Sequence, residues 1–504
     1  MPVIEDQMSA TTLRVGHFIG GESVAGDGGH QIFDPATGSA RAIAAVADSQ
    51  TVEQAVAAAR AALASWSAMG LQRRAAIMLD LREAVRDARD ELVDLVIAEL
   101  GKTRVDAGAE VDRAIEVLGQ AASVPSWYGT SFSPHVSIGV DAFEVRYPIG
   151  VIAAVSPFNF PVLIPVVQFA VAVACGNTVV LKPSDRDPSA TVRIAEICSQ
   201  AGLPDGVLNV VLGGKQVVEA LVDHADVAGI SFVGSSAVAQ EIRTAGVAKN
   251  KRVQAFGGGK NHMVVLPDGD LDLAADAAVS AAFGAAGQRC MAVSVVVAVG
   301  DIGDTLAAKI ATRAAGLRVG NPADPASDVG PVISPESRDR IMNYLAAARS
   351  EGAAVIADDR AAPTEGAGWW IPPVVIDHVR PGMAVHSDEI FGPVLSIVRA
   401  ATYRDAMAVI ASHPLGNGAA IFTRDGGVAR RFVDEVEAGQ VGVNVPIPFP
   451  TFFHNFGGWK DSAFTETKLF GPGALAFCTR TKTVSQRWPD AASSRIELGF
   501  PMPR

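Results

Sequence analysis

The feature that most constrains this chain is an alternation, from Val151 onward, of short apolar runs with stretches of helical periodicity. Short continuous apolar runs are typical of strands buried on both faces of a parallel sheet. Because parallel strands need a crossover connection, usually a helix, this order indicates βαβ units and a doubly wound α/β sheet. We predict strands at Val151–Val155, Thr178–Lys182, Val207–Val211 and Ile230–Val233, and helices at Pro188–Ala201 and Ser236–Ala245.

The rest of the chain supplies further helices and a second α/β alternation. Apolar positions recur at helical spacing in the N-terminal part, and residues 261–450 again alternate strand and helix patterns. At 504 residues, the chain is long enough for about three structural units. We predict helices at Thr51–Trp66, Leu71–Leu100 and Asp106–Ala122, and strands near Met263–Leu266, Val293–Val299 and Val394–Val398.

Two β patterns stand apart from these alternations. Residues 136–147 alternate apolar and polar positions around a turn near Gly139, and Phe477–Val484 is a Thr-rich alternating run. A small ribbon is marginally stable alone, so we expect the two pieces to pair between subunits by strand addition. The alternative is an ordinary edge hairpin inside one subunit.

Composition excludes several classes of protein. The net charge is −12, with 42 Lys and Arg against 54 Asp and Glu, which argues against binding to a nucleic-acid backbone. The four cysteines are widely spread and the nine histidines form no HExxH pattern, so we expect neither a disulfide scaffold nor a metal site. The N-terminus has no apolar signal segment, and prolines interrupt the most apolar stretch, residues 148–181. We therefore expect a cytoplasmic protein without a membrane span.

Two places along the first alternation suit a nucleotide. Neither a GxGxxG motif nor a P-loop is present, since Gly257-Gly258-Gly259-Lys260 is followed by asparagine. Gly234-Ser235-Ser236 opens a helix after a predicted strand, which is a favourable place for a phosphate. Lys182 and Asp185 end another strand and could hold ribose hydroxyls, and the carboxylate favours NAD over NADP. The alternative is that both are a solvated strand end.

A cysteine and an amide suggest nucleophilic catalysis. Cys290 follows a run of small residues, and Asn159 lies in a Pro-flanked turn after the first predicted strand. If they meet in space, the thiol is a nucleophile and the amide an oxyanion donor. A lone cysteine, however, is more often a small buried hydrophobe.

Five motifs in order carry a family resemblance. They are Pro-Phe-Asn-Phe-Pro at 157–161, Leu-Lys-Pro-Ser at 181–184, Ser-Phe-Val-Gly-Ser at 231–235, Gly-Gln-Arg-Cys at 287–290 and Glu-Ile-Phe-Gly-Pro-Val at 389–394. Over nearly its whole length the chain resembles the aldehyde dehydrogenase superfamily. The resemblance implies a Rossmann-type NAD-binding domain (1–128 and 149–258), an α/β catalytic domain (259–462) and a small β oligomerisation element (129–148 and 474–488). It also implies a homo-oligomer, a dimer or a tetramer.

The same motifs imply a role for each site residue. By resemblance, Cys290 is the nucleophile and Asn159 the oxyanion donor. Ser156 and Phe158 are implied to bind NAD, without a more exact place. The other implied NAD-binding residues are Lys182 and Asp185 at the adenosine ribose, Ser235 near the pyrophosphate, Glu389 at the nicotinamide ribose and Phe391 beside the nicotinamide.

One departure points to a subfamily. Hydrolytic members carry Glu-Leu-Gly-Gly-Lys where this chain has Phe256-Gly257-Gly258-Gly259-Lys260, so the glutamate that activates water is missing. A thiol acceptor such as coenzyme A needs less help, because a pKa of about 8.5 leaves a few per cent thiolate at neutral pH. The segments at 146–151, 253–255, 260–262 and 287–292 are similar to methylmalonate-semialdehyde dehydrogenases. These enzymes oxidise methylmalonate or malonate semialdehyde with NAD, lose carbon dioxide and release propionyl-CoA or acetyl-CoA.

A carboxylated aldehyde needs cationic groups. Arg289 adjoins the nucleophile and is expected to face the pocket, and Arg113 matches the subfamily's other pocket arginine. Two guanidinium groups can bind one carboxylate in forked geometry. For Arg113 the alternative is a solvated helix face. Two rival functions remain: a hydrolytic semialdehyde dehydrogenase with Glu466 as its base, and a catalytically silent protein on the same fold.

Overall fold

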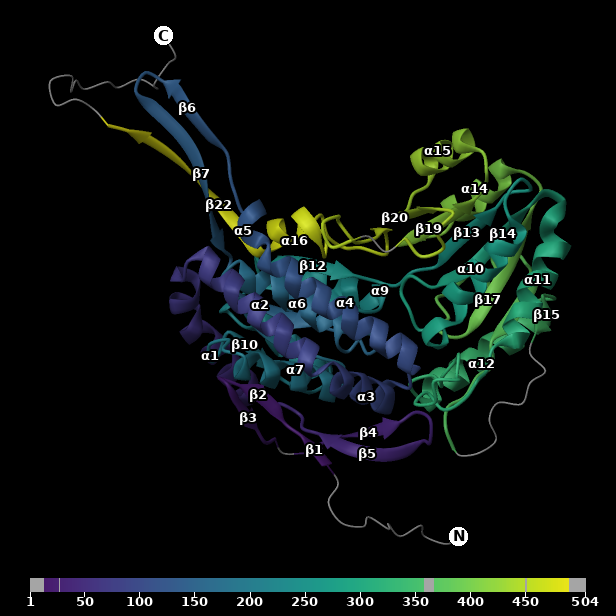
Figure 1. Ribbon diagram of the computed structural model, residues 1–504, viewed down its shortest axis with the longest axis horizontal. Helices are drawn as coiled ribbons and strands as arrows, with labels where there is room; N and C mark the ends of the chain where they lie inside the picture. The colour runs from purple at the N-terminus through teal and green to yellow at the C-terminus, as the bar shows by residue number, and fades with distance from the viewer. Residues whose placement is uncertain (1–12, 27, 358–366, 449–450, 489–504) are drawn as a thin grey trace, which may run out of the picture.

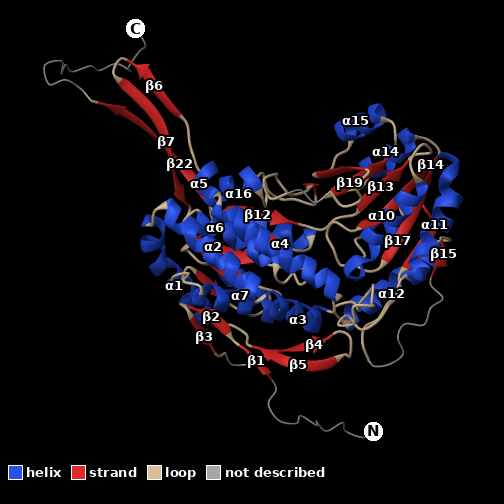
Figure 2. Cartoon of the chain, in the orientation of Figure 1, coloured by secondary structure: helices blue, strands red, loops and turns tan. Residues whose placement is uncertain are grey.

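The computed structural model describes residues 13–26, 28–357, 367–448 and 451–488. Within them, the chain forms two seven-stranded sheets and a three-stranded arm that projects from the body (Figure 1). Helices flank both large sheets (Figure 2). The predicted α/β fold class is therefore confirmed.

The first sheet contains the predicted βαβ units. β8 and β9 have the predicted bounds, whereas β11 begins three residues earlier than predicted, at Val227. The chain runs from β8 to one side through β9 and β10, and later to the other side through β11 and β12. In such sheets, ligands bind at the carboxyl ends of the strands near this change of direction. The strands, in spatial order, are β12 (Arg252–Phe256), β11 (Val227–Val233), β8 (Val151–Val155), β9 (Thr178–Lys182), β10 (Leu208–Val210), β2 (His17–Ile19) and β3 (Glu22–Val24).

The second sheet follows the first and is built in the same way. All its neighbouring strands are parallel except β15, which pairs antiparallel with β16. In spatial order they are β15 (Ala354–Ala357), β16 (Val374–Val379), β17 (Val394–Ala400), β14 (Val293–Val299), β13 (Asn261–Val265), β19 (Gly418–Phe422) and β20 (Gln440–Val443). Helices α10 (Leu271–Phe283), α11 (Gly303–Gly316), α12 (Pro335–Ser350), α14 (Tyr403–Ala411) and α15 (Gly426–Glu435) accompany it.

The N-terminal third covers the first sheet. Its helices are α1 (Ser49–Ala68), α2 (Leu71–Asp87), α3 (Arg89–Leu100) and α4 (Arg104–Ala122), and α7 (Ser189–Gln200) and α9 (Ser236–Ala248) connect the strands. The single helix predicted over Leu71–Leu100 is wrong, because Ala88, at φ −89° and ψ 10°, breaks it. No glycine or proline marks that break. The short strands β1 (Leu13–Val15), β4 (His30–Asp34) and β5 (Ser39–Ala44) were not predicted.

The apolar stretch at 148–181 is a piece of the core. It forms β8, a turn, the fully buried helix α6 (Leu163–Ala174), and β9. In the described part of the chain, no helix combines the length and the apolar character that crossing a membrane requires.

The arm joins the two separate β pieces within one chain. It contains β6 (Phe132–Ser137), β7 (Val140–Pro148) and β22 (Thr479–Arg487), and β22 pairs antiparallel with β7 along its whole length. The two pieces therefore form one sheet within a single chain, and strand addition between this sheet and another subunit stays a prediction. The predicted start of the last strand is wrong, because Phe477 and Cys478 end α16 (Gly471–Cys478).

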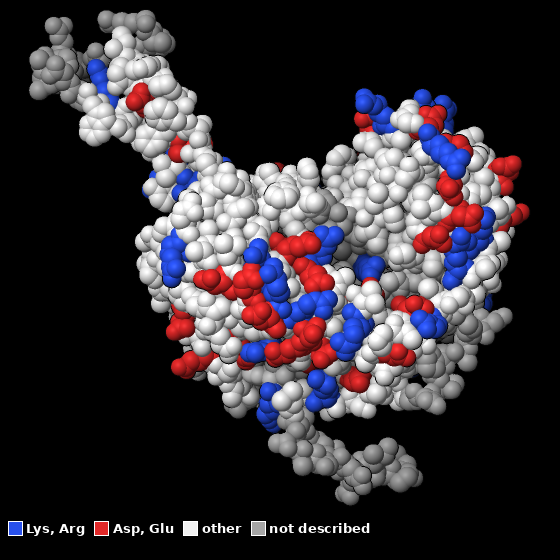
Figure 3. All heavy atoms as spheres, in the orientation of Figure 1, with Lys and Arg blue, Asp and Glu red and all other residues white. Residues whose placement is uncertain are grey.

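The surface of the arm differs from the surface of the body. Acidic and basic side chains interleave over the helical face of the body, whereas the arm shows few charges (Figure 3). Phe132 and Ile138 expose 61% and 65% of their surface there. An exposed apolar sheet of this kind suits contact with another protein surface.

Candidate active site

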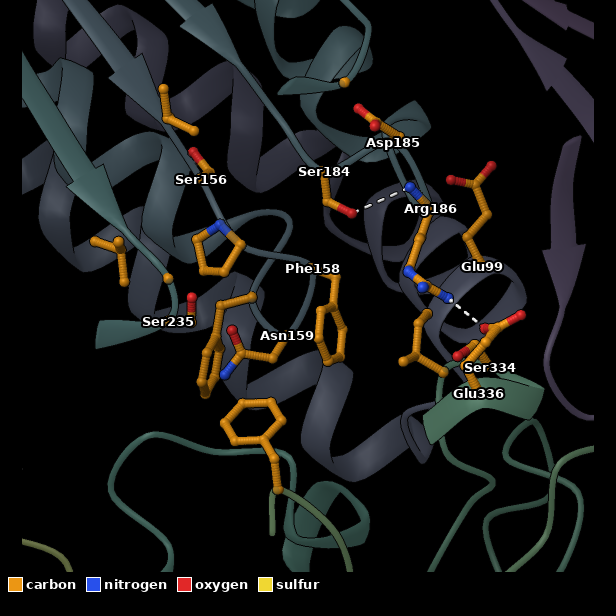
Figure 4. A pocket seen from close by; sticks show the side chains of 18 of the residues that line it. Glu99, Ser156, Phe158, Asn159, Ser184, Asp185, Arg186, Ser235, Ser334 and Glu336 are labelled. Atoms are coloured by element: carbon orange, nitrogen blue, oxygen red, sulfur yellow. Dashed lines mark hydrogen bonds and ion pairs between the residues drawn. The ribbon is translucent and has the colours of Figure 1, made fainter. Parts of the chain in front are cut away.

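A cavity of about 1160 Å³ runs along the carboxyl ends of β8, β9 and β11 toward the second sheet. In Figure 4, Phe158 lies between the Ser235 side of the cavity and the side formed by Arg186, Ser334 and Glu336. The structure brings most of the predicted site residues together there, namely Ser156, Phe158, Asn159, Lys182, Asp185, Ser235, Cys290, Glu389 and Phe391.

Asn159 and Cys290 meet in this cavity although they come from different sheets. Asn159 follows β8 and is 3% exposed. Its Nδ2 donates a hydrogen bond to the carbonyl oxygen of Gln288, 3.0 Å away, two residues before Cys290. A carboxamide has two N–H donors, so the second can serve a substrate oxygen. The pair is thus arranged as a nucleophile and an oxyanion donor.

The Cys290 thiol is protonated at rest. Burial raises its pKa to about 12, and the nearby Glu389 carboxylate adds to the shift. A thiolate is the reactive form, so this site must lower that pKa or remove the proton when its ligands bind.

The backbone before Cys290 is strained. Ala285 and Ala286 have φ of 52° and 53°, in the left-handed region that costs a residue with a Cβ roughly 1–2 kcal/mol. Such strain persists only where surrounding contacts impose it, and it concentrates at functional sites.

A buried ion pair anchors the loop that carries Asn159. The Lys102 ammonium lies 2.6 Å from the Glu110 carboxylate, and both side chains are almost wholly buried. Glu110 Oε1 accepts the backbone N–H groups of Val162 and Leu163, at 2.8 and 3.1 Å. The Lys102 Nζ also lies 3.8 Å from the ring centroid of Phe160. No local pattern predicted this anchor, since a lysine and a glutamate in a polar helical region ordinarily face solvent.

The far end of the cavity suits an adenosine ribose. Lys182 Nζ lies 2.9 Å from Asp185 Oδ1, at the carboxyl end of β9. Apart from this ion pair, the buried Asp185 oxygen accepts no hydrogen bond from the described residues, so a ligand hydroxyl can donate to it. Ser235 is the N-cap of α9 and its side chain makes no capping bond, so the helix N–H groups can meet a phosphate. These residues fit a dinucleotide such as NAD.

Glu389 is held at the near end of the cavity. Its Oε1 accepts the Gly259 N–H at 2.9 Å, and a side chain at Gly258 would collide with the carboxylate. Burial raises the pKa of Glu389. Lys260, 2% exposed, donates from Nζ to the carbonyl oxygens of Val385 and Asp388, both at 2.8 Å. Burial lowers the pKa of Lys260 to about 7.

Aromatic rings and a buried polar group complete the cavity wall. Phe158 and Phe391 lie edge to face, with centroids 5.7 Å apart. Ser156 lines the cavity, but its hydroxyl donates to Gln168 Oε1 at 2.7 Å. The side chain of Ser156 is therefore engaged with the core, and its role toward a cofactor stays a prediction.

The two predicted substrate arginines do not line the cavity that contains Cys290. Arg289 forms an ion pair with Asp106, in the first turn of α4. Arg113, with 49% of its side chain exposed, lies 2.6 Å from Glu116. In this structure the carboxylate of Asp106 binds the guanidinium of Arg289, so the expectation that Arg289 faces the pocket stays a prediction.

The position of the missing base is filled by an aromatic ring. Phe256 ends β12, is 6% exposed, and packs in a core group that includes Phe452, Phe456 and Phe470. Glu466, the alternative base, is exposed and does not line the cavity. Glu389 is a cavity carboxylate whose charge acts on Cys290.

Comparisons with curated proteins agree with this site. The chain is 42% identical over 490 residues to a malonate-semialdehyde dehydrogenase of Pseudomonas aeruginosa, covering 96% of this chain and 99% of the relative. It is 42% identical over 484 residues to malonate-semialdehyde dehydrogenase 1 of Geobacillus thermodenitrificans, covering 95% of this chain and 100% of the relative.

Solved structures agree as well. A methylmalonate-semialdehyde dehydrogenase of Oceanimonas doudoroffii matches with a TM-score of 0.94 and 43% identity, over 96% of this chain and 99% of that chain. A Sinorhizobium meliloti protein, proposed to be a methylmalonate-semialdehyde dehydrogenase and solved with NAD, matches with a TM-score of 0.94 and 41% identity. That match covers 96% of this chain and 100% of the other.

The model of the Aldehyde dehydrogenase family matches residues 24–484. A cysteine and an amide at the carboxyl edge of a doubly wound sheet, this match and the relatives together show that the chain belongs to the aldehyde dehydrogenase family.

Proposed function

We propose that the protein oxidises methylmalonate or malonate semialdehyde with NAD and passes the acyl group to coenzyme A. Carbon dioxide is lost, and propionyl-CoA or acetyl-CoA is released. The names of its relatives support a semialdehyde of this kind as the substrate. The buried Phe256, in place of a base that could activate water, carries the choice of a thiol acceptor.

Cys290 attacks the aldehyde carbon as a thiolate. The amide of Asn159 and the backbone N–H of Cys290 donate to the resulting oxyanion, and loss of one such donor slows the reaction about a hundredfold or more. When bound by Lys182, Asp185, Ser235 and Glu389, NAD supplies the hydride acceptor that turns the hemithioacetal into a thioester.

The same oxyanion donors serve decarboxylation. The thioester on Cys290 carries a carboxylate on its α-carbon, and breaking that bond releases carbon dioxide and leaves the electron pair as a thioester enolate. Its negative charge lies on the oxygen that Asn159 faces. A proton then completes the acyl group, and the thiolate of coenzyme A displaces Cys290.

Arg113 and Arg289 supply specificity for the carboxylate in this proposal. A guanidinium that binds the carboxylate stabilises the ground state before decarboxylation, so it lowers the Michaelis constant more than it accelerates the loss of carbon dioxide. Arg289→Ala should chiefly raise the apparent KM for carboxylated aldehydes.

The test is mass spectrometry of products from malonate semialdehyde and NAD, with and without coenzyme A. We expect acetyl-CoA with coenzyme A and a stalled acyl-enzyme after about one turnover without it. Cys290→Ala, which should form no NADH, is the control. Sustained release of free acid without coenzyme A would establish the hydrolytic alternative. Loss of that release in Glu389→Gln would then identify Glu389 as its base.

We also propose that the protein forms a homo-oligomer, a dimer or a tetramer, through the arm. The exposed apolar side chains of Phe132 and Ile138 support this. Light scattering after size-exclusion chromatography should give the mass of an oligomer, and Ile138→Lys should shift it toward the monomer.

A further inference from the structure

We propose that Asp106 is a positioning residue for carboxylate recognition, which acts by holding Arg289 and the turn that leads into Cys290. This inference rests on the proposed function, because it takes Arg289 as a group that binds the substrate carboxylate. Asp106 itself does not line the cavity that contains Cys290.

Asp106 connects two parts of the loop before the nucleophile. Its Oδ1 accepts a hydrogen bond from Nη2 of Arg289, and its Oδ2 accepts the backbone N–H of Ala285 at 2.7 Å. The side chains of Asp106 and Arg289 are 15% and 22% exposed, so solvent screens this contact less than a surface pair. The Asp106 carboxylate thus holds both the guanidinium of Arg289 and the backbone N–H of Ala285.

The backbone group that Asp106 holds is the strained one. Ala285 and Ala286 are both in the left-handed region, five and four residues before Cys290. A turn in this conformation needs support from outside itself. The hydrogen bond from Ala285 to Asp106, across 179 positions of the chain, supplies such support.

Arg289 has little freedom beside that turn. A Cβ added at Gly284 would lie 2.5 Å from Nη1 of Arg289, so the guanidinium is packed against the loop backbone. A guanidinium has five N–H donors, and Asp106 takes one. The remaining donors can bind a substrate carboxylate, in a plane that Asp106 determines.

Asp106 also balances nearby positive charge. Burial lowers the pKa of Lys102 and its partner Glu110 opposes that shift; in addition, the Asp106 carboxylate raises this pKa and the Arg289 guanidinium lowers it. Asp106 lies in the first turn of α4, the helix that carries Arg113 two turns later on the same face. The first turn of α4 is itself fixed, since the hydroxyl of Thr103 accepts the Asp106 N–H at 3.4 Å.

The experiment compares Asp106→Asn and Asp106→Ala with the wild type on two aldehydes. Malonate semialdehyde carries a carboxylate, and propanal does not. Asparagine keeps an oxygen for the Ala285 N–H but removes the charge, whereas alanine removes both. Asp94→Asn is the matched control, because it breaks an exposed ion pair with Arg104, the first residue of α4.

For Asp106→Asn, we expect kcat/KM for malonate semialdehyde to fall about 10- to 100-fold through KM, the range for a lost charge-assisted hydrogen bond. The value for propanal should change less than about threefold on the same principle, since propanal gains nothing from Arg289. Asp106→Ala should also slow the oxidation of both aldehydes and change the rate at which iodoacetamide alkylates Cys290.

A double-variant comparison shows whether Asp106 acts through Arg289. The double variant Asp106→Asn with Arg289→Gln should have the same kcat/KM for malonate semialdehyde as Arg289→Gln alone. An equal loss on both aldehydes in Asp106→Asn would overturn the inference, because it would indicate a structural effect. A lower KM would also overturn it, because Asp106 would then compete with the substrate. The proposed function is judged separately, by whether the wild type prefers malonate semialdehyde and needs coenzyme A.

Discussion

The side-chain amide of Asn159 donates a hydrogen bond to the carbonyl oxygen of Gln288, across 3.0 Å and 129 positions of the chain. The bond joins the loop after β8 to the loop that carries Cys290. Because both ends are buried, the oxyanion donor is oriented before a substrate arrives. It follows that the rate of aldehyde oxidation should depend on the position of the Asn159 amide, and not only on the presence of a polar group there.

Asn159→Ala should therefore reduce kcat for aldehyde oxidation about a hundredfold or more, the usual loss of one oxyanion donor. Stopped-flow measurement of NADH formation checks this. Asn159→Gln keeps the amide but moves it by one methylene, and we expect it to rescue little. Full activity in the alanine variant would contradict the assignment of Asn159.

Phe256→Ala should cost about 3–5 kcal/mol of unfolding free energy, since it removes a buried ring from the packed core. The space left can admit water but no base, so turnover should still require coenzyme A. Urea unfolding and a coenzyme A titration measure the two effects. Phe256→Leu is the control that keeps the packing, and rapid coenzyme A-independent hydrolysis in either variant would count against the proposed acyl transfer.

Lys102→Met should destabilise the protein by about 3–5 kcal/mol, because it leaves the buried Glu110 carboxylate without its cation. Adding Glu110→Gln should recover part of this, since the amide oxygen can still accept from Val162 and Leu163. Arg104→Met, which breaks an exposed pair with Asp94, should cost no more than about 1 kcal/mol. Similar losses of unfolding free energy in Lys102→Met and Arg104→Met would show that the buried ion pair stabilises the protein no more than the exposed one.

Lys260→Met should weaken NAD binding about tenfold, because two buried carbonyl oxygens beside Glu389 lose their donor. Quenching of tryptophan fluorescence by NAD measures the dissociation constant. Lys249→Met changes an exposed lysine of α9's C-terminal end and should have no effect. If the Lys260 variant binds NAD with an unchanged dissociation constant, the conformation of the segment before Glu389 does not depend on that lysine.

Acid should destabilise the protein through three buried histidines. The rings of His262, His386 and His413 lie 5.5 to 5.6 Å apart. Burial lowers all three pKa values, that of His386 to about 4, and the neighbouring histidines and Lys260 add to the shifts.

The unfolded chain takes up protons at these histidines as pH falls through about 6.5, whereas in the folded chain burial lowers the pKa of all three, and His386 stays neutral until about pH 4. The contribution of His386, up to about 3 kcal/mol, is thus present above pH 6.5 and lost on acidification. Urea unfolding at pH 7.5 and 5.0 should show the loss, and His386→Gln should reduce it. His454→Gln, at an exposed position, should leave the difference unchanged.

Local pattern predicted much of the fold and of the site. β8, β9 and β14 have the predicted bounds, and the predicted cofactor residues share one cavity. Periodicity failed where no local residue marks the change, as at Ala88, and where strands have only three residues, as in β1 to β3. In those places packing decides the backbone, and packing partners are distant in the chain.

The amino-acid sequence alone determined the α/β class, the family and the absence of a base at Phe256, and it predicted Cys290 as the nucleophile. These follow from residue types and spacings that are local or occur in motifs. Only the tertiary structure decided that Arg289 pairs with Asp106, that Lys102 and Glu110 anchor the Asn159 loop, and that β22 pairs with β7. A charged group binds the nearest opposite charge, and a strand edge pairs with the nearest free edge. That distance exists only once the chain has folded.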